Sequence, residues 1–155
     1  MGQVAQSRAK TRQQIVDLQS CLEYVTENGL CEALKERLVH HFAPGLYIRE
    51  FHMNAGDVVV GKIHKYAHAN TLAKGKVVVT TEYGGRETIE APAVFVSQPG
   101  TKRAVHALED TVWVTYQPTD KTDPEEIEKD VIADSFEEFE EHICYEQKKV
   151  LENKQ

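Results

Sequence analysis

The sequence predicts a mainly β domain with an α-helical flank at each end. Short runs rich in Val, Thr, Tyr and Phe lie between closely spaced turns over residues 46–118, and apolar residues recur every three or four positions on both sides of that segment. With 155 residues and 41% hydrophobic residues, the chain can bury one core. We therefore expect one globular unit, with an N-terminal helical flank at 1–45, a β domain at 46–118 and an acidic C-terminal helical flank at 119–155.

The N-terminal flank is predicted to be helical over residues 7–40. Apolar residues at helical spacing mark a first helix at Ile15, Leu18, Leu22 and Val25 and a second at Leu34 and Leu38. Asn28-Gly29 is typical of a helix end and separates the two. His40 and His41 then fall at the end of the second helix, where an imidazolium interacts favourably with the helix dipole.

The middle segment is predicted to contain about eight strands. Turns such as Asn54-Ala55-Gly56-Asp57, Lys74-Gly75 and Pro99-Gly100 separate them. The expected strands are Leu46–Met53, Val58–His64, Ala67–Ala73, Lys76–Tyr83, Arg86–Glu90, Ala93–Val96, Thr101–Leu108 and Thr111–Gln117. This number of short strands in some seventy residues is typical of a small jelly roll or barrel.

The C-terminal flank returns to a helical pattern from Thr122 onward. Asp123-Pro124-Glu125-Glu126 combines an N-cap residue, a proline in the first turn and acids that face the helix dipole. Ile127, Val131, Phe136 and Phe139 would form the stripe that packs against the domain.

Composition limits the classes of function. The net charge is −7, and residues 119–155 hold thirteen acids against five Lys, so this tail repels nucleic acid. No apolar run approaches the 18 residues that a membrane helix needs, and the N-terminus lacks the apolar core of a secretory signal. The cysteines Cys21, Cys31 and Cys144 form no CxxC pair and are expected to be reduced, partly buried thiols. Together these features favour a cytoplasmic protein.

The residues that carry chemistry are concentrated around two histidines. If the backbone is extended there, Lys62, His64, Tyr66 and His68 project from one face of a strand. Inside a small barrel this face would line a confined cavity, where neutral imidazole is a good metal ligand. Histidines also occur on exposed strand surfaces, which is the alternative interpretation.

This segment resembles the cupin family, and the resemblance covers Leu46 to Gln117. The first cupin motif runs from a glycine through two histidines and a glutamate to a closing glycine, and Gly56-Asp57 and Lys74-Gly75 match its two ends. Counting back from Gly75, the resemblance puts Lys62 on the first histidine position, His64 on the second and His68 on the glutamate position. The chain also resembles short cupin proteins with similar flanks, which are common among uncharacterised proteins of tailed bacteriophages. This resemblance would place a phage-encoded chain in the host cytoplasm, where it could act against a host pathway.

The second cupin motif has a Pro-Gly turn followed by a histidine. Pro99-Gly100 matches the turn, and Arg103 occupies the usual histidine position. His106 follows three residues later with the opposite parity, so it reaches the same cavity as Arg103 only across a bulge.

Two interpretations of the pocket follow. In the first, His64, His68 and His106 hold a divalent transition metal such as Zn, Fe, Ni or Mn, which would support dioxygenase, isomerase or lyase chemistry. In the second, Lys62, Arg103 and the histidines form a metal-free cationic cavity for a phosphate or carboxylate. Metal-free cupins that act on sugar nucleotides are a family precedent for the second.

The leading functional hypothesis is thus a cupin-type pocket protein that binds or transforms a small polar or anionic metabolite at Lys62, His64, His68, Arg103 and His106. The alternative is a non-catalytic protein that sequesters a ligand or contacts another protein. A homodimer is expected, because the flanking helices and sheet edges offer apolar surface. The aromatic residues Tyr66, Tyr83, Trp113 and Tyr116 are assigned to the core or the sheet surface rather than to the ligand.

Overall fold

The computed structural model describes residues 2–28 and 37–152, and these form a mainly β fold with three helices. The elements in chain order are α1 (Gln3–Glu27), β1 (Leu38–Ala43), β2 (Leu46–Met53), β3 (Val58–Val60), β4 (Ile63–His64), β5 (His68–Lys74), β6 (Lys76–Thr81), β7 (Gly85–Glu90), β8 (Ala93–Ser97), β9 (Arg103–Ala107), β10 (Thr111–Pro118), α2 (Pro124–Val131), β11 (Ile132–Ala133) and α3 (Phe136–Glu152). The predicted fold class, a β domain with helical flanks, is confirmed.

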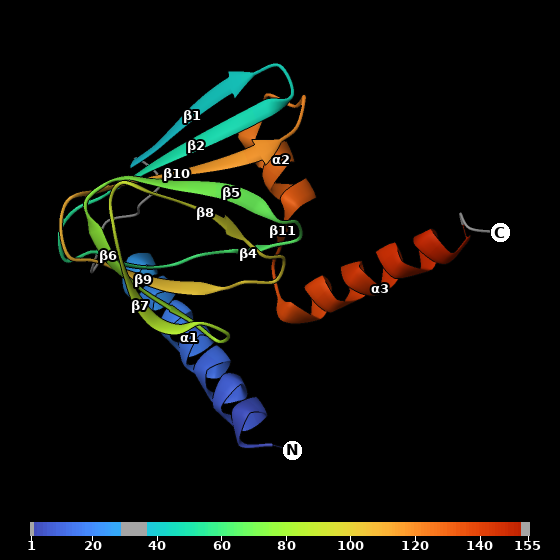
Figure 1. Cartoon of the computed structure of the whole chain (residues 1–155), viewed down its shortest axis with the longest axis horizontal. Coiled ribbons are helices and arrows are strands. Elements are labelled where there is room, and N and C mark those ends of the chain that lie inside the picture. Colours follow the sequence, from blue (N-terminus) through green and yellow to red (C-terminus); the bar gives the residue numbers. More distant parts are fainter. Residues whose placement is uncertain (1, 29–36, 153–155) are drawn as a thin grey trace.

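Two antiparallel sheets build the domain (Figure 1). One has the strand order β1-β2-β10-β5-β8, and the other has the order β3-β9-β6-β7. A short pair, β11-β4, joins the C-terminal segment to the domain. Strands that are far apart in the sequence are neighbours in a sheet, since β10 pairs with both β2 and β5. This crossing-over is the jelly-roll pattern, although the described strands group into separate sheets rather than one closed barrel.

The core lies between the two sheets. Met53, Leu72 and Trp113 come from the five-stranded sheet, while Val77, Val79, Val105 and Ala107 come from the four-stranded sheet. Strict alternation produces this arrangement, since side chains along a strand point to opposite faces. In β10, for example, the buried positions are every second residue from Thr111 to Gln117.

The predicted strand Val58–His64 divides into β3 and β4. The break falls at Gly61, whose backbone N–H donates to the carbonyl of Arg103 at 2.8 Å. Beyond it, β4 leaves the four-stranded sheet and pairs with β11, where His64 lies opposite Ile132. Steric constraints explain why a glycine closes the motif. Gly75 has φ +89°, and a Cβ there would lie 2.5 Å from the Thr111 hydroxyl.

The second predicted N-terminal helix is wrong where the structure can be compared. Leu38 and the His40-His41 pair lie in strand β1, and Leu34 falls outside the described residues. β1 pairs with β2 from Leu38 opposite Phe51 to Ala43 opposite Leu46. The two residues between these strands are Pro44-Gly45, so they form a hairpin turn that supplies β1 with a partner. The histidines therefore do not cap a helix.

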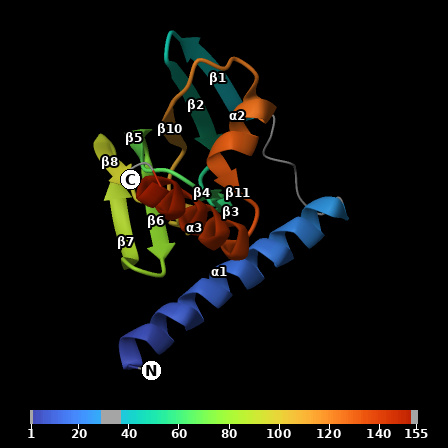
Figure 2. The ribbon, with the colours of Figure 1, turned by 90° about the vertical axis from the view of Figure 1, so that its right-hand side faces the viewer.

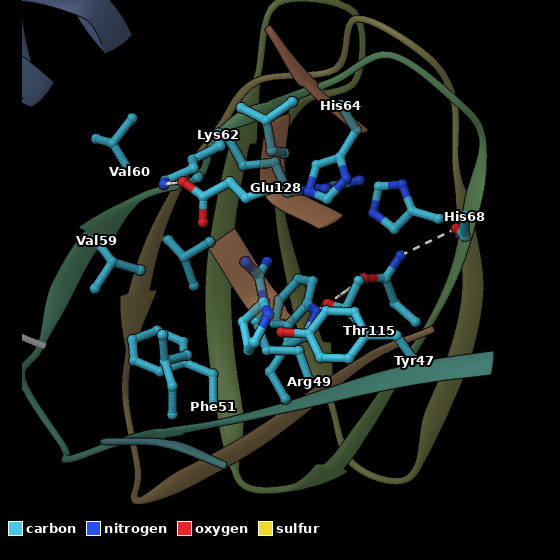
Figure 3. Close-up of a pocket in the computed structure, with 18 of the residues that line it drawn as sticks. Tyr47, Arg49, Phe51, Val59, Val60, Lys62, His64, His68, Thr115 and Glu128 are labelled. Carbon is cyan, nitrogen blue, oxygen red and sulfur yellow. Dashed lines mark hydrogen bonds and ion pairs between the residues drawn. The ribbon is translucent and has the colours of Figure 1, made fainter. Parts of the chain in front are cut away.

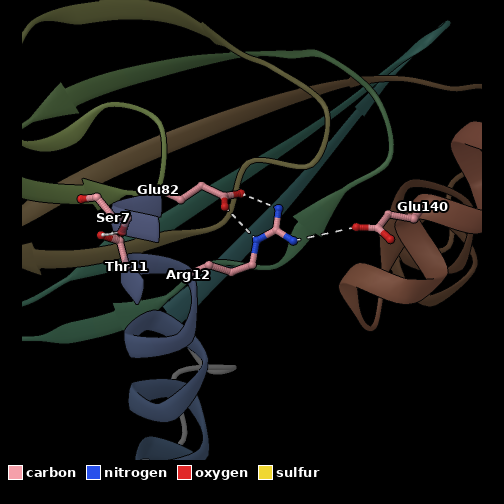
Figure 4. A network of polar contacts seen from close by, with 5 residues as sticks. All are labelled: Ser7, Thr11, Arg12, Glu82 and Glu140. Carbon is pink, nitrogen blue, oxygen red and sulfur yellow. Dashed lines mark hydrogen bonds and ion pairs between the residues drawn. The ribbon is translucent and has the colours of Figure 1, made fainter. Parts of the chain in front are cut away.

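Helix α1 crosses beside the four-stranded sheet (Figure 2) and buries one of its described side chains, Ile15. A network of polar contacts connects this helix to the domain (Figure 4). The Arg12 guanidinium donates to both carboxylate oxygens of Glu82, at 2.7 and 3.0 Å, and lies 3.9 Å from Glu140 of α3. Since Glu82 follows β6, this one arginine connects α1, the sheet and α3.

The C-terminal segment begins as predicted and then departs from the prediction. The Asp123 carboxylate accepts the backbone N–H groups of Glu125 and Glu126, so the N-cap of α2 is confirmed. The helix stops at Val131 because the next two residues pair with β4, and α3 starts afresh at Phe136. The predicted stripe is therefore split between two helices.

The cysteines that are described, Cys21 and Cys144, are exposed, which corrects the expectation of partial burial; Cys31 lies outside the described residues. Within residues 2–28 and 37–152, no helix is both long and apolar enough to span a membrane.

Candidate functional site

A cavity of about 860 Å³ opens between the two sheets (Figure 3). Its walls come from inward-facing positions of β2, β5, β9 and β10, from the β3–β4 segment, and from α2 and β11 on one side. The C-terminal segment is thus part of the cavity and not a separate appendage. In β2, β5, β9 and β10 the lining residues are every second residue, because side chains along a strand point alternately to the two faces of the sheet.

Four of the five predicted site residues line this cavity: Lys62, His64, His68 and Arg103. The fifth, His106, does not. It is exposed, on the opposite face of β9 from Val105, which does line the cavity. The pairing of β9 with β3 and β6 runs without a register shift, so no bulge turns His106 inward. The expected three-histidine set is therefore not brought together.

The two remaining histidines form a buried, stacked pair. Their rings lie 3.9 Å apart between centroids with an interplanar angle of 30°, and Figure 3 shows them side by side. The exposed fractions are 7% for His64 and 5% for His68. The Gln117 amide nitrogen donates to Nδ1 of His64 at 2.8 Å, and Nδ1 of His68 donates to the Tyr66 carbonyl at 3.2 Å. Each ring thus uses Nδ1 for protein contacts.

Both imidazoles are neutral at physiological pH. The pKa of His64 is lowered to about 2, chiefly by burial and in the same direction by the neighbouring His68 and the positive charges of Arg49, Arg103 and Lys62. Burial is also the main cause of the lowered pKa of His68, with Arg103 and Arg49 acting the same way against the hydrogen bond to Tyr66. Two uncharged rings therefore lie close to positive charges that include Arg49 and Arg103.

Two of these positive charges belong to half-buried arginines. Arg49 points inward from β2 and Arg103 from β9, and burial lowers the pKa of both. Arg103 donates to the Ser97 hydroxyl at 2.5 Å and lies about 6 Å from the ring centroids of Phe95 and Trp113. Arg49 has no hydrogen bond or ion pair with any part of the chain that the structure describes.

A buried polar network supports the arginine wall. Asn70 is 1% exposed; its amide nitrogen donates to the Ser97 hydroxyl at 2.7 Å, and its oxygen accepts from the Trp113 indole at 3.0 Å and from Thr115 at 3.3 Å. Ser97 is thus fixed by Asn70 on one side and contacts Arg103 on the other. This network positions both Arg103 and the indole of Trp113.

The charge near α2 is balanced by ion pairs. Lys62 is paired with Glu128, and Lys65 lies 2.9 Å from Glu138, so acids of the C-terminal segment offset these lysines. The predicted cationic role of Lys62 is therefore weakened by its partner. Arg49 and Arg103 form no ion pair within residues 2–28 and 37–152, although Glu87 attracts Arg103 electrostatically.

The residues present do not fit a metal centre of the kind expected from the sequence. The two cavity histidines stack face to face, and His106 lies on the outer side of β9. Among the described residues, no group of three His, Cys, Asp or Glu side chains is arranged to hold a metal ion. Two stacked rings leave a metal short of the three protein ligands typical of catalytic sites.

Sequence reasoning missed Arg49 and set Trp113 aside. Tyr47, Arg49, Phe51 and Met53 share parity on β2, and all four line the cavity. An arginine at an inward position between two aromatic residues was the available signal, since such a residue is rarely buried without a ligand or a partner. His40, predicted to cap a helix, also lines the cavity, and its Nδ1 lies 2.7 Å from the Tyr47 hydroxyl.

Comparisons with known proteins agree with this fold. The chain has a cupin fold: an ectoine synthase from P. lautus has a TM-score of 0.50 at 11% identity, with 64% of this chain and 84% of that chain covered. A cupin-2 domain containing protein from Shewanella frigidimarina has a TM-score of 0.45 at 10% identity, covering 62% of this chain and 92% of its own. A salicylate 1,2-dioxygenase from Pseudaminobacter salicylatoxidans has a TM-score of 0.48 at 12% identity, covering 66% and 32%. No profile of a known protein family and no curated protein matches the sequence.

Proposed function

We propose that this cupin binds a small organic anion whose carboxylate is held by Arg49 and Arg103. The observation that carries the proposal is Arg49, a half-buried guanidinium in a cavity wall that has no hydrogen bond or ion pair in the described chain. Placing a charge in such a position costs free energy unless an opposite charge compensates it. A bound carboxylate supplies that charge and accepts paired hydrogen bonds from a planar guanidinium.

The charges around the two histidines support an anion over a cation at that side of the cavity. Arg49 and Arg103 both appear among the charges that lower the pKa of His64 and of His68. The same field attracts a negative group. With both rings uncharged, the histidines add hydrogen-bonding groups without adding further positive charge.

The rest of the lining favours an organic anion with an apolar part. Phe51, Met53, Val105 and Trp113 contribute apolar surface next to the arginines. The volume of about 860 Å³ lies within the range of small-molecule sites, roughly 300–1,000 Å³. A metabolite that combines a carboxylate with an aromatic or branched apolar group would use both features.

The test is calorimetric titration with a matched pair of probes, 4-phenylbutanoate and its uncharged amide, 4-phenylbutanamide. The two have the same shape, so any difference in affinity reports the charge. We expect the carboxylate to bind at least tenfold more tightly, and the preference to fall in Arg103→Gln. The matched control is Arg86→Gln, which removes the same charge from the exposed strand β7. Equal affinities for the two probes, or no binding of either, would show that the proposal is wrong.

A further inference from the structure

We propose that His64 and His68 act as a hydrogen-bond donor and a proton acceptor that together enolise a bound 2-oxo acid. The inference rests on the proposed function, because the carboxylate of the substrate is the group that Arg49 and Arg103 hold. It goes further by assigning a reaction class and a separate role to each ring.

The roles follow from the hydrogen bonds at Nδ1. An amide nitrogen can only donate, so the contact from Gln117 makes Nδ1 of His64 the acceptor and leaves the proton of the neutral ring on Nε2. A carbonyl can only accept, so the contact to Tyr66 places the proton of His68 on Nδ1 and leaves a lone pair on Nε2. Two stacked imidazoles thus hold opposite tautomers.

The protein fixes these tautomers from different elements. Gln117 is 3% exposed at the end of β10, so its amide is held in place by the domain. The Tyr66 carbonyl belongs to the backbone just before β5 and cannot donate. Neither contact involves a charged group, so Nε2 of each ring remains for a ligand in the cavity that both residues line.

The chemistry is a proton transfer next to a carbonyl. Nε2 of His68 takes a proton from the carbon beside the 2-oxo group, and the C–H electron pair forms the new C=C bond. The carbonyl π electrons move to oxygen, and the resulting enolate accepts a hydrogen bond from Nε2–H of His64. Return of the proton from His68 to carbon regenerates both rings, so no oxidant, reductant or metal enters the step.

The surroundings suit these roles. A neutral imidazole is a better match than an imidazolium for an enolate oxygen, because it polarises the carbonyl without giving up its proton. His68 starts as a weak base, since burial and the arginines lower its pKa. A substrate carboxylate offsets the charges of Arg49 and Arg103, so the basicity of His68 increases when the substrate is bound.

The first test follows the exchange of hydrogen for deuterium in 2-oxo-4-phenylbutanoate by proton NMR in D₂O. We expect loss of the signal from the CH₂ group beside the carbonyl at a rate well above that in buffer. His68→Gln should lower this rate about 100-fold or more, in the range by which acid–base groups contribute. His106→Gln is the matched control, because His106 lies outside the cavity, and its exchange rate should be unchanged.

Each outcome separates this inference from the proposed function. Binding of 4-phenylbutanoate without exchange of the oxo acid above the buffer rate would overturn the inference and leave anion binding intact. Exchange that persists in His68→Gln would likewise overturn it. If neither acid binds, the proposed function itself fails.

A second test needs no substrate. Nitrogen-15 NMR of the imidazoles should show the proton on Nε2 of His64 and on Nδ1 of His68, and Gln117→Leu should release the His64 tautomer while His68 keeps its own. The same tautomer on both rings of the wild-type protein would contradict the assignment of roles.

Discussion

Replacement of Arg49 by methionine should have opposite effects on stability and on binding. The side chain is half-buried without a hydrogen bond or ion pair in the described chain, so its charge is desolvated in the empty protein. Methionine fills a similar volume without that penalty. In the bound protein, by contrast, the variant lacks a guanidinium for the ligand carboxylate.

The expected changes in stability and in affinity can be worked from typical energies of buried polar groups and of hydrogen bonds to charged groups. Relief of an uncompensated polar group is worth about 1 kcal/mol at the lower end of protein mutational data, which for a domain of this size raises the melting temperature by roughly 2–4 °C. A hydrogen bond to a charged group contributes ~1.5–3 kcal/mol, so the affinity for 4-phenylbutanoate should fall roughly 10- to 150-fold.

The assays are urea unfolding without ligand and calorimetry with 4-phenylbutanoate. Arg86→Met is the control, because it removes an exposed arginine from β7 and should alter neither quantity substantially. A variant Arg49→Met that is less stable than wild type by more than about 1 kcal/mol would mean that Arg49 stabilises the fold through contacts of its own. Unchanged affinity would refute its role in binding.

Four further predictions concern the histidine pair, the wall network, one turn and the assembly. The pKa of His64 is about 2 in the folded protein and near 6.5 in the unfolded chain, so the unfolded chain binds more protons as the pH falls through 6.5 and the free energy of unfolding decreases. Urea unfolding should show a loss of at least ~1.4 kcal/mol from pH 7.5 to 5.5, and a smaller loss in His64→Gln. Asn70→Ala leaves the buried Trp113 N–H without its acceptor and should cost ~2–4 kcal/mol, with indole fluorescence reporting the altered environment; a neutral substitution would contradict the network. Gly100→Ala should destabilise the fold more than Gly56→Ala. Both glycines have positive φ, but only at Gly100 would a Cβ meet a side chain, the Phe139 ring at 2.5 Å. Equal losses of stability would mean that α3 moves away from the added methyl group at no cost. The homodimer stays a prediction: light scattering should give twice the chain mass at high micromolar concentration, and a monomer mass would contradict it.

Local signals in the sequence were enough to predict most of the fold. β2 has the predicted bounds, because alternation and flanking turns mark it on both sides. The N-cap at Asp123 was also predictable, since capping depends on four neighbouring residues. β1 was not, because a strand of six residues without clear alternation is recognisable mainly through its partner. Pro44-Gly45 gains its meaning as a hairpin turn only once β1 is known.

The sequence pattern was enough to predict part of the site. Lys62, His64 and His68 line the cavity as expected, although they share no single strand: Lys62 follows β3, His64 ends β4 and His68 begins β5. Tyr66 has the same parity and is exposed. Arg103 lines the cavity as the family motif implied. Parity did decide His106, whose opposite parity needed a bulge that β9 does not contain. Arg49 depends on contacts between distant segments: its position matters because β2 faces β9 and β4 across the cavity. A single strand does not reveal which strands it will face.

The most direct test of the proposed anion site is a crystal structure of the protein grown with 4-phenylbutanoate. We expect the carboxylate to lie within hydrogen-bonding distance of the guanidinium groups of Arg49 and Arg103, with the phenyl ring against Phe51 or Trp113. A carboxylate bound at the acidic α2 side of the cavity, or outside the cavity altogether, would contradict the claim that the arginine wall is an anion site.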